Sequence, residues 1–482
     1  MSLGEGSPRQ LPIIRQGYSR MPVRLVERYV LPQAALFLLV ATFVSFYGQL
    51  DRKQSADTYA TVYTAVAVVR DGSFRLDRYL PIIQVRSGER PGQLDRGEDG
   101  HLYSHFPVAP AFFGVPAVAV LAAAGVSPEN WGAHMEAGFL SGALATAAAV
   151  ALFFLLLTRL TTRPRALVAA AVLAWATPVW TIAGQGLWQH GPALLALAGA
   201  LLAIVSRRPV PAGFALASMV VFRPSTVVLA ALLLPLFVPR PRALALGALG
   251  ALPPAAFLAA YNWTVFGSPL STGYGDVTGE AGFSGSLLEG LSGNLVAPGR
   301  GIFVYAPVLL VAVAGAVLGR RLPLYRWAAL ALVAHVLFVA RWFEWWGGEA
   351  FGPRQLVDAL PLFALLLVPA LDRWAASPRF RRLFAALAAW SVAVHLLGAA
   401  LWPGTGWYDS HAVREFGTWW SLTDTELTAL FSDPGRLLAR GGLMALVVLG
   451  ALAAGLLAAL VAEAWSSRRG ARARAPALPP AR

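Results

Sequence analysis

The stretch HMEAGFLSGALATAAAVALFFLLL, residues 134–157, decides the fold class of this chain. It runs for 24 residues and carries one formal charge, on Glu136 near its start. An α-helix rises about 1.5 Å per residue, so this stretch is long enough to cross the ~30 Å hydrocarbon core of a bilayer. We therefore predict a transmembrane helix here, and the neighbouring sequence repeats the pattern on both sides.

Eleven further apolar blocks accompany it, at about 29–49, 166–183, 190–206, 210–222, 225–239, 243–262, 302–319, 326–342, 356–371, 384–402 and 440–463. Together they predict an all-α polytopic membrane protein with about twelve transmembrane helices. Of the 482 residues, 57% are hydrophobic and only 13% are charged, whereas soluble domains carry about 25% charged residues. The composition excludes soluble enzymes, nucleic-acid-binding proteins and secreted domains as descriptions of the whole chain.

A thirteenth apolar stretch, Phe106–Val126, contains prolines 107, 110 and 116 in its first half. Each proline removes a backbone donor that lipid cannot replace. We therefore predict an interfacial or re-entrant helix rather than a span. The distribution of charge agrees: with both termini in the cytoplasm, the cytoplasmic segments hold 24 basic and four acidic residues, and the other side holds 15 basic and 21 acidic.

The net charge of +14 therefore reflects orientation in the cell (plasma or inner) membrane rather than a nucleic-acid partner. We predict a basic cytoplasmic N-terminus (1–28), a first transmembrane helix (29–49) and a first extracytoplasmic loop with interfacial helices (50–133). A transmembrane bundle with extracytoplasmic loops (134–463) and a basic cytoplasmic tail (464–482) follow.

The first extracytoplasmic loop offers a candidate catalytic carboxylate. From Thr58 to Arg70, apolar residues recur at helical spacing, which predicts an amphipathic helix on the membrane surface. Asp57 stands at its start, where aspartate is a common N-cap. Besides capping, a carboxylate held there is suited to accept a proton from a substrate hydroxyl.

Several motifs resemble those of the GT-C glycosyltransferases. The likeness is greatest to bacterial family 39 members, which are related to protein O-mannosyltransferases and lipid A aminoarabinose transferases. The motifs are DGSFRLD (71–77), GHLYSHFPVAPAFFGVP (100–116), LWQHGPALL (187–195), FRPS (222–225), YNWTVFGSPLSTGYG (261–275), APGRGIFVYAPVLL (297–310) and WWGGEAFGPRQLVDALP (345–361). The resemblance implies transfer of a sugar from a polyprenyl-phosphate donor to an acceptor hydroxyl on the extracytoplasmic face. It also implies that Asp57 is the catalytic residue, although Thr58 stands where many relatives carry a second acid.

A lipid phosphate that leaves needs its charge stabilised, and arginine binds phosphate through two hydrogen bonds. Arg354 matches the family's late Pro-Arg motif and is the first candidate for this contact; Arg300 and Arg223 are the others. Snorkelling to the interface is the alternative interpretation of all three. With Asp57 as the base and the phosphate leaving from the opposite face, the reaction would invert the anomeric centre.

Further candidate substrate-binding residues lie in the same motifs: His105, His190, Tyr274, Trp345, Trp346 and Glu349. We interpret His335 and His395 as polar contacts between helices. Asp358, four residues after Arg354, is placed to pair with it on one helix face. The chain has no cysteine and no histidine pair with metal-ligand spacing, so we expect no protein-built zinc site and no cofactor, leaving a divalent metal open.

The main alternative function is a multi-pass transporter or a flippase of glycolipid precursors, because about twelve helices are common in transporters. Against it, the carboxylates gather outside the predicted bilayer core rather than at its midplane. The expected partners are a polyprenyl-phosphate-linked sugar, membrane lipids and an acceptor that is a glycan, a lipid or a protein. The sequence names neither the sugar nor the acceptor.

Overall fold

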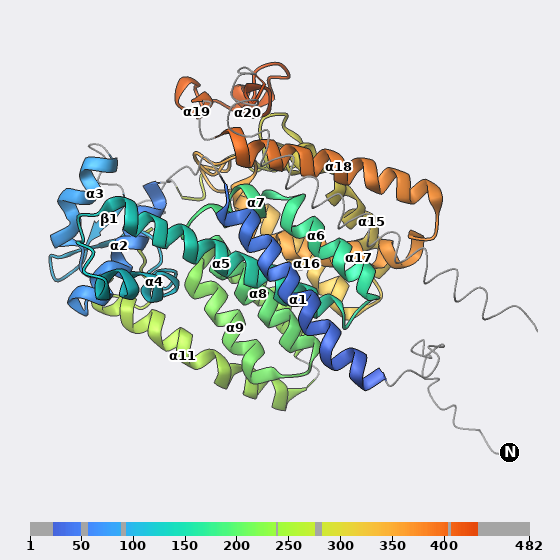
Figure 1. Cartoon of the computed structure of the whole chain (residues 1–482), viewed down its shortest axis with the longest axis horizontal. Helices are drawn as coiled ribbons and strands as arrows, with labels where there is room; N and C mark the ends of the chain where they lie inside the picture. The colour runs from blue at the N-terminus through green and yellow to red at the C-terminus, as the bar shows by residue number, and fades with distance from the viewer. Residues whose placement is uncertain are drawn as a thin grey trace, which may run out of the picture.

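The computed structural model describes residues 23–49, 56–87, 93–237, 240–274, 282–402 and 406–431. Within these ranges the chain is mostly helical, with one two-stranded hairpin, so the all-α prediction is confirmed (Figure 1). The predicted helix at 440–463, the tail at 464–482 and residues 1–22 of the N-terminus lie outside the described residues.

Among the described residues, five helices are long and apolar enough to cross a membrane: Trp131–Leu157, Pro241–Phe266, Pro323–Ala340, Arg354–Trp374 and Pro378–Leu401. Arg163–Trp175 and Pro178–Gln185, bent by 41° at a short break, make a sixth if they are taken as one span. Shorter apolar helices occupy Pro32–Tyr47, Ala111–Ala123, His190–Val205, Pro209–Phe222, Pro224–Leu236 and Pro307–Gly319. The chain therefore has several helices suited to a membrane, while the number twelve stays a prediction.

One half of the bundle consists of helices packed side by side, namely α1 (Val23–Tyr47), α5 (Trp131–Leu157), α8 (His190–Val205), α9 (Pro209–Phe222) and α11 (Pro241–Phe266) (Figure 1). Small residues allow α9 and α11 to approach closely. A Cβ on Gly213 would lie 1.8 Å from the backbone oxygen of Gly247, and a Cβ on Gly250 would lie 2.0 Å from that of Val210. Glycine contacts of this kind are typical of helix pairs in membranes.

The other half contains α6 (Arg163–Trp175), α10 (Val227–Leu233), α15 (Leu310–Gly319), α16 (Pro323–Ala340), α17 (Leu360–Trp374) and α18 (Pro378–Leu401). Residues 360–368 of α17 are all buried, so this helix forms much of the core. A Cβ on Gly315 would lie 1.7 Å from the backbone oxygen of Leu366, which keeps α15 against α17.

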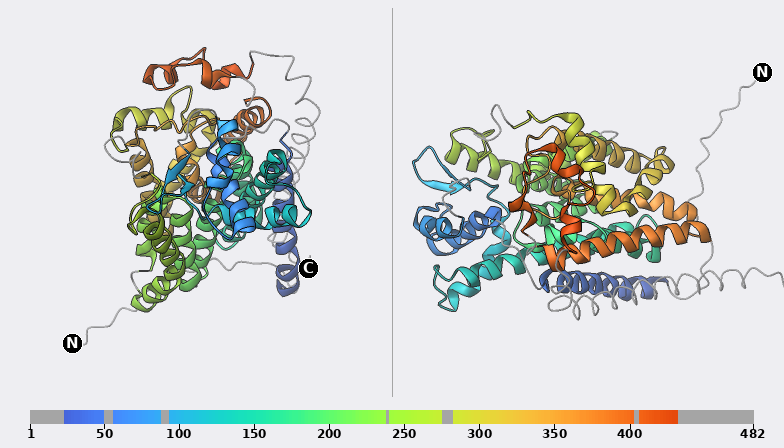
Figure 2. Two further views of the ribbon diagram at one scale, coloured as in Figure 1. Left: turned by 90° about the vertical axis from the view of Figure 1, so that its left-hand side faces the viewer. Right: turned by 90° about the horizontal axis from the view of Figure 1, so that it is seen from above.

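A separate segment lies at one end of the bundle (blue to teal in Figures 1 and 2). It contains α2 (Ala56–Asp71), η1 (Asp77–Tyr79), α3 (Leu80–Ser87), β1 (Leu94–Arg96), β2 (Leu102–Ser104) and α4 (Ala111–Ala123). The strands are antiparallel, with Leu94 opposite Ser104. At 13 residues, α4 is only about 20 Å long, which supports the prediction that Phe106–Val126 is an interfacial or re-entrant helix rather than a span.

The amphipathic pattern predicted for α2, with one exposed face, is wrong. Residues 58–67 are all buried, because α4 and α5 pack against this helix and the aromatic rings of Tyr63 and Trp131 stack with centroids 5.6 Å apart. A helix buried on all sides needs no polar face. Its threonines, at 58, 61 and 64, are buried with the rest. The carboxylate at its start is therefore held by a rigid, packed helix.

Short elements connect these parts: α7 (Pro178–Thr181), η2 (Ala183–Gln185), η3 (Pro224–Thr226), η4 (Leu234–Leu236), α13 (Leu287–Val296), α14 (Ile302–Tyr305), η5 (Pro307–Leu309), η6 (Arg354–Ala359), α19 (Trp407–Ser410), η8 (Phe416–Trp420) and α20 (Glu426–Ala429). The α19 and α20 region lies outside the bundle (orange-red, top of Figure 1 and of the left view in Figure 2).

Candidate active site

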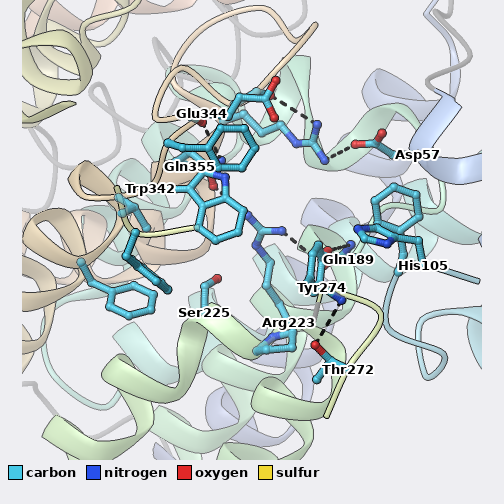
Figure 3. Close-up of a pocket in the computed structure, with 18 residues that line it drawn as sticks. Asp57, His105, Gln189, Arg223, Ser225, Thr272, Tyr274, Trp342, Glu344 and Gln355 are labelled. Carbon is cyan, nitrogen blue, oxygen red and sulfur yellow. Dashed lines mark hydrogen bonds and ion pairs between the residues drawn. The ribbon is translucent and has the colours of Figure 1, made fainter. Parts of the chain in front are cut away.

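A cavity of about 440 Å³ opens where the α2–α4 segment meets the bundle (Figure 3). Residues from eight separate stretches of the chain line it: Asp57, His105, Phe106, Gln189, Arg223, Pro224, Ser225, Thr272, Tyr274, Phe283, Phe338, Val339, Trp342, Phe343, Glu344, Gly347, Arg354 and Gln355. It thus joins carboxylates, guanidinium groups and a histidine with an aromatic wall, a combination typical of a ligand site.

The loop between α16 and η6 delivers Arg354 to the cavity. Gly347 and Gly348 have φ angles of +78° and +68°, in the left-handed region that favours glycine. These two residues turn the chain back on itself, so that a Cβ on Gly347 would lie 2.9 Å from the Cβ of Arg354. The glycine pair therefore has a backbone role, and it sets the direction from which the arginine enters.

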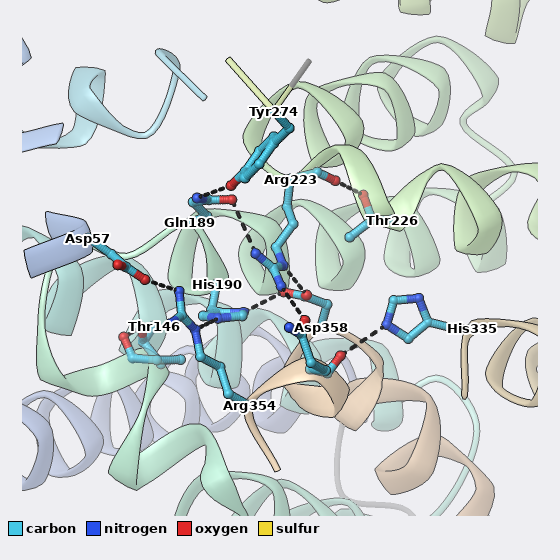
Figure 4. Close-up of polar contacts among 12 residues, drawn as sticks. Asp57, Thr146, Gln189, His190, Arg223, Thr226, Tyr274, His335, Arg354 and Asp358 are labelled. Carbon is cyan, nitrogen blue, oxygen red and sulfur yellow. Dashed lines mark hydrogen bonds and ion pairs between the residues drawn. The ribbon is translucent and has the colours of Figure 1, made fainter. Parts of the chain in front are cut away.

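The guanidinium of Arg354 forms an ion pair with the carboxylate of Asp57 (Figure 4). Its Nε donates to Nε2 of His190 at 3.4 Å, and Nη1 donates to the backbone oxygen of Gly347 at 3.3 Å. It also lies over the ring of Trp188, 4.2 Å from the centroid. Arg354 is thus held on three sides, while its Asp57 contact faces the cavity.

A buried polar network lies behind this pair (Figure 4). Because Nε2 of His190 accepts from Arg354, its proton is on Nδ1, which donates to Asp358 at 2.8 Å. The other carboxylate oxygen of Asp358 accepts from Nε of Arg223 at 2.5 Å. Arg223 donates through its remaining nitrogens to the amide oxygens of Gln189 (3.2 Å) and Gln355 (3.0 Å). Its charge is balanced and its geometry is fixed by these partners.

The β1–β2 hairpin supplies a histidine–carboxylate pair on the opposite wall. Nδ1 of His105 lies 2.9 Å from the carboxylate of Asp95, and the ring packs edge-to-face on Tyr274 with centroids 4.8 Å apart. Gln189 donates to the hydroxyl of Tyr274 at 2.9 Å. A Cβ on Gly273 would lie 2.3 Å from the backbone oxygen of His105, so the 268–274 loop packs tightly against the hairpin.

An aromatic wall closes the remaining side, where α16 meets residues 282–286 before α13. The ring centroids of Phe283 and Phe338 are 4.8 Å apart, and those of Phe283 and Trp342 are 5.4 Å apart. Phe283 is 42% exposed, so this wall continues to the outer surface. Figure 3 shows Trp342 on one side of the cavity and Asp57 and His105 on the other, with Arg223 between them.

Glu344 is a second carboxylate on the cavity lining. Burial raises its pKa, an effect that the nearby positive charge of Arg354 partly offsets and the negative charge of Asp57 increases. Its side chain therefore binds a proton more readily than an exposed glutamate. From the sequence alone, a glutamate beside the tryptophan pair is explained equally well by a hydrogen bond to a sugar and by a solvated loop.

Five of the predicted site residues border the cavity together: Asp57, His105, Arg223, Tyr274 and Arg354. His190 lies just behind them and contacts Arg354 instead of the cavity. Asp57 is the second residue of α2, inside the first turn rather than at the N-cap. An acid in the first turn is also stabilised by the helix dipole.

Arg300, predicted as a phosphate ligand, occupies a different place. Its side chain is fully buried, and it donates to the backbone oxygens of Gly348, Ala350 and Gly352. It also pairs with Glu426 at 3.2 Å and lies over the ring of Trp419. These contacts surround the guanidinium and hold the 347–352 loop, so Arg300 is structural.

The predicted ligand role of the tryptophan pair does not fit its position either. Trp345 and Trp346 are 3% and 8% exposed and pack against Trp407 and Trp419 in a core of their own. Glu349 lines a separate cavity of about 10 Å³ beside Trp402. The glycines beside the pair, Gly347 and Gly348, form the turn described above.

The predicted pair between Arg354 and Asp358 is wrong. The residues lie in η6, a 3₁₀ helix with three residues per turn, so positions four apart point about 120° away from each other. Asp358 pairs with Arg223 and His190 instead. The interpretation of His395 as a contact between helices is confirmed: it meets Thr181 of α7 at 3.3 Å. His335 contacts the backbone oxygen of Gln355 at 3.4 Å.

Sequence reasoning missed the residues that hold the charged groups in place: Gln189, Gln355 and Asp95. The first two directly adjoin predicted residues in WQHG and GPRQ, so their adjacency was a usable signal. No signal in the sequence pointed to Asp95, because only the strand pairing brings it to His105.

The part of the chain that the structure describes contains no group of three or more His, Cys, Asp or Glu side chains arranged to hold a metal ion. No protein-family model matches the chain, and no curated protein matches it.

Proposed function

We propose that this protein is a membrane glycosyltransferase that moves a sugar from a polyprenyl-phosphate donor to an acceptor hydroxyl. One observation carries the proposal: a carboxylate on a rigid helix, Asp57, meets the guanidinium of Arg354 at a cavity with an aromatic wall. This arrangement suits a reaction in which a proton is taken from one substrate while a phosphate leaves from the other.

Arg354 is the phosphate ligand in this proposal. Guanidinium groups bind phosphate through two parallel hydrogen bonds, and a partly dry site strengthens them. The side chain of Arg354 is 13% exposed, which keeps it accessible at the cavity but shields it from bulk water. Arg223 also lines the cavity, with its charge balanced by Asp358 and its position held by two glutamine side chains.

Asp57 acts as the general base. The acceptor oxygen forms a bond to the anomeric carbon, the bond from that carbon to the phosphate oxygen breaks, and the hydroxyl proton passes to the carboxylate of Asp57. The electron pair leaves with the prenyl phosphate, whose added negative charge lies next to Arg354. Attack opposite the leaving group inverts the anomeric centre, which NMR analysis of the product anomer tests.

The aromatic wall suits the prenyl chain. Phe283, Phe338 and Trp342 form an apolar surface that reaches from the guanidinium groups to the outside of the bundle. An isoprenoid chain can move from the lipid tails onto such an apolar surface without the cost of desolvating polar groups. The polar wall with His105 and Tyr274 is left for the acceptor.

In the membrane, we propose about twelve spans, both termini in the cytoplasm, and a GT-C-like architecture with the cavity on the extracytoplasmic face. The basic loops of residues 159–165, 207–208 and 373–382 then face the cytoplasm, in keeping with the positive-inside rule. The α2–α4 segment forms the first extracytoplasmic loop and covers the cavity from that side.

The test is an assay of purified protein with radiolabelled polyprenyl-phosphate sugars. We expect the wild type to release prenyl phosphate, and Asp57→Asn to reduce turnover by about 10²- to 10⁴-fold, the usual contribution of a general base. Asp372→Asn, which removes an exposed carboxylate paired with Arg165, is the matched control and keeps activity. Wild-type turnover by Asp57→Asn would remove Asp57 from the mechanism. Relocation of intact lipid across vesicles would favour the transporter or flippase alternative.

A further inference from the structure

Arg354 has two kinds of partner in the structure. Trp188, His190 and the backbone of Gly347 hold the guanidinium from behind and from the sides. Asp57 meets it at the cavity lining, where the carboxyl side chain is still 30% exposed. The first group of contacts fixes the position of the arginine, and the last one occupies its cavity-facing nitrogen, Nη2.

A carboxylate and a phosphate monoester or diester are the same kind of ligand for a guanidinium. Both offer two anionic oxygens to the same pair of N–H groups, and both form charge-assisted hydrogen bonds. Nη2 of Arg354 already donates one N–H group to the carboxylate of Asp57. A phosphate that enters the cavity therefore competes with Asp57 for this nitrogen.

The neighbouring arginine offers no easier partner. Nε, Nη1 and Nη2 of Arg223 donate to Asp358, Gln189 and Gln355, and the residue is only 8% exposed. Breaking these contacts would leave the buried carboxylate of Asp358 without its charge partner, which is costly. Arg354 is thus the arginine of this cavity whose partner is the more readily exchanged.

We infer that a lipid phosphate displaces Asp57 from Arg354, so that the carboxylate is released to act as a base only when the donor is bound. This inference rests on the proposed function, since it assigns the phosphate of the donor to the site of Arg354. It makes Asp57 an internal competitor of the donor and sets an order in which donor binding precedes deprotonation of the acceptor.

The exchange has a chemical consequence. In the resting protein, Oδ2 of Asp57 accepts from Nη2 of Arg354. Once the phosphate takes this nitrogen, Oδ2 can turn to the acceptor hydroxyl and accept its proton. As the phosphate leaves the sugar it gains one negative charge, and Asp57 loses one by taking the proton, so the net charge around Arg354 is unchanged.

The inference makes an unusual prediction for binding. Removal of a residue that contacts a substrate normally weakens binding, whereas removal of an internal competitor strengthens it. The probe is undecaprenyl phosphate, titrated into the purified full-length protein in nanodiscs, with inorganic phosphate titrated in parallel. Inorganic phosphate reports a site for the free ion, and a preference for the lipid reports a site for the headgroup and chain together.

We expect Asp57→Asn to bind undecaprenyl phosphate about tenfold more tightly than the wild type, which corresponds to about 1.4 kcal/mol. Asp372→Asn, the control for loss of one carboxylate elsewhere, should bind like the wild type. In an Arg354→Met background, the Asp57→Asn substitution should have no effect on affinity, because the shared partner is gone. Asp57→Ser, which also removes the charge, should reproduce the gain and serves if the asparagine variant fails to fold.

Two results are distinguishable. If the wild type binds the lipid phosphate but Asp57→Asn and Asp57→Ser bind it equally or less tightly, the competition is absent and the inference is overturned while the proposed function stands. If neither the wild type nor these variants bind undecaprenyl phosphate, or if only inorganic phosphate binds, the proposed function fails as well, and the inference with it.

Discussion

Arg300 and Arg354 both contact the backbone of the glycine loop at 347–352, and each pairs with a carboxylate from a distant part of the chain. The pair of Arg300 and Glu426 is fully buried, and backbone oxygens and a tryptophan ring fill the space around it. The pair of Arg354 and Asp57 borders a cavity of about 440 Å³. The same chemistry therefore holds a loop in one place and leaves a ligand site in the other, depending on what surrounds it.

The largest expected effect tests the structural half of this comparison. Arg300→Met should destabilise the protein by about 3–5 kcal/mol, because it leaves Glu426 buried without its charge partner. Thermal unfolding of the detergent-solubilised variant measures the loss. The double variant Arg300→Met with Glu426→Gln should recover part of it. A stable Arg300→Met protein that loses prenyl phosphate binding would instead return Arg300 to the phosphate site.

The ligand half is tested by Arg354→Met. We expect undecaprenyl phosphate to bind about 10- to 150-fold more weakly, as expected for the loss of hydrogen bonds to a charged group worth about 1.5–3 kcal/mol. The unfolding temperature should fall less than for Arg300→Met, because the ion pair borders open space. Equal losses of stability in the two variants would break the comparison, since Arg354 would then be structural too.

A smaller effect is expected from the histidine–carboxylate pair on the opposite wall. Asp95→Asn should lower kcat/KM for transfer by about tenfold, because the carboxylate orients the ring of His105 and sets which nitrogen carries the proton. The matched control is Asp99→Asn in the hairpin turn, where the carboxylate pairs with the exposed Arg75. An equal loss in both variants would mean that the hairpin is merely sensitive to mutation.

The smallest effect concerns pH and the second cavity carboxylate. Burial raises the pKa of Glu344 in the folded state, so the folded protein binds more protons than the unfolded chain between the ordinary glutamate value and that raised pKa. Stability contributed by this group is present at low pH and is lost as pH rises through this window. Glu344→Gln should therefore flatten the fall in unfolding temperature on going upward from about pH 4.5. An unchanged slope would show that Glu344 is not the group responsible.

Local sequence patterns predicted the features that depend on short stretches. Apolar runs long enough to cross a bilayer appear as helices such as α5 and α11, and the proline-rich start of Phe106–Val126 corresponds to a short helix. In the loop at 347–352, the glycine content by itself indicates backbone freedom but not what that freedom serves. Its glycines bend the chain, and the tryptophans beside them fill a core.

Local sequence patterns could not predict which arginine faces a cavity. Arg354, Arg300 and Arg223 all lie in motifs of similar appearance, and their surroundings come from residues far away in the chain. Asp57 and Arg354 are 297 positions apart, and Arg223 and Asp358 are 135 apart. The wrong prediction that Asp358 pairs with Arg354 has a local cause. It assumed the repeat of an α-helix where the chain forms a 3₁₀ helix.

The amino-acid sequence by itself determined that this protein is helical and suited to a membrane, because hydrophobicity and helix length are properties of each segment alone. It also identified Asp57 and Arg354 as chemically capable residues. Only the tertiary structure decided that these two meet at a cavity while Arg300 is enclosed, because burial and ion pairing depend on which segments pack together.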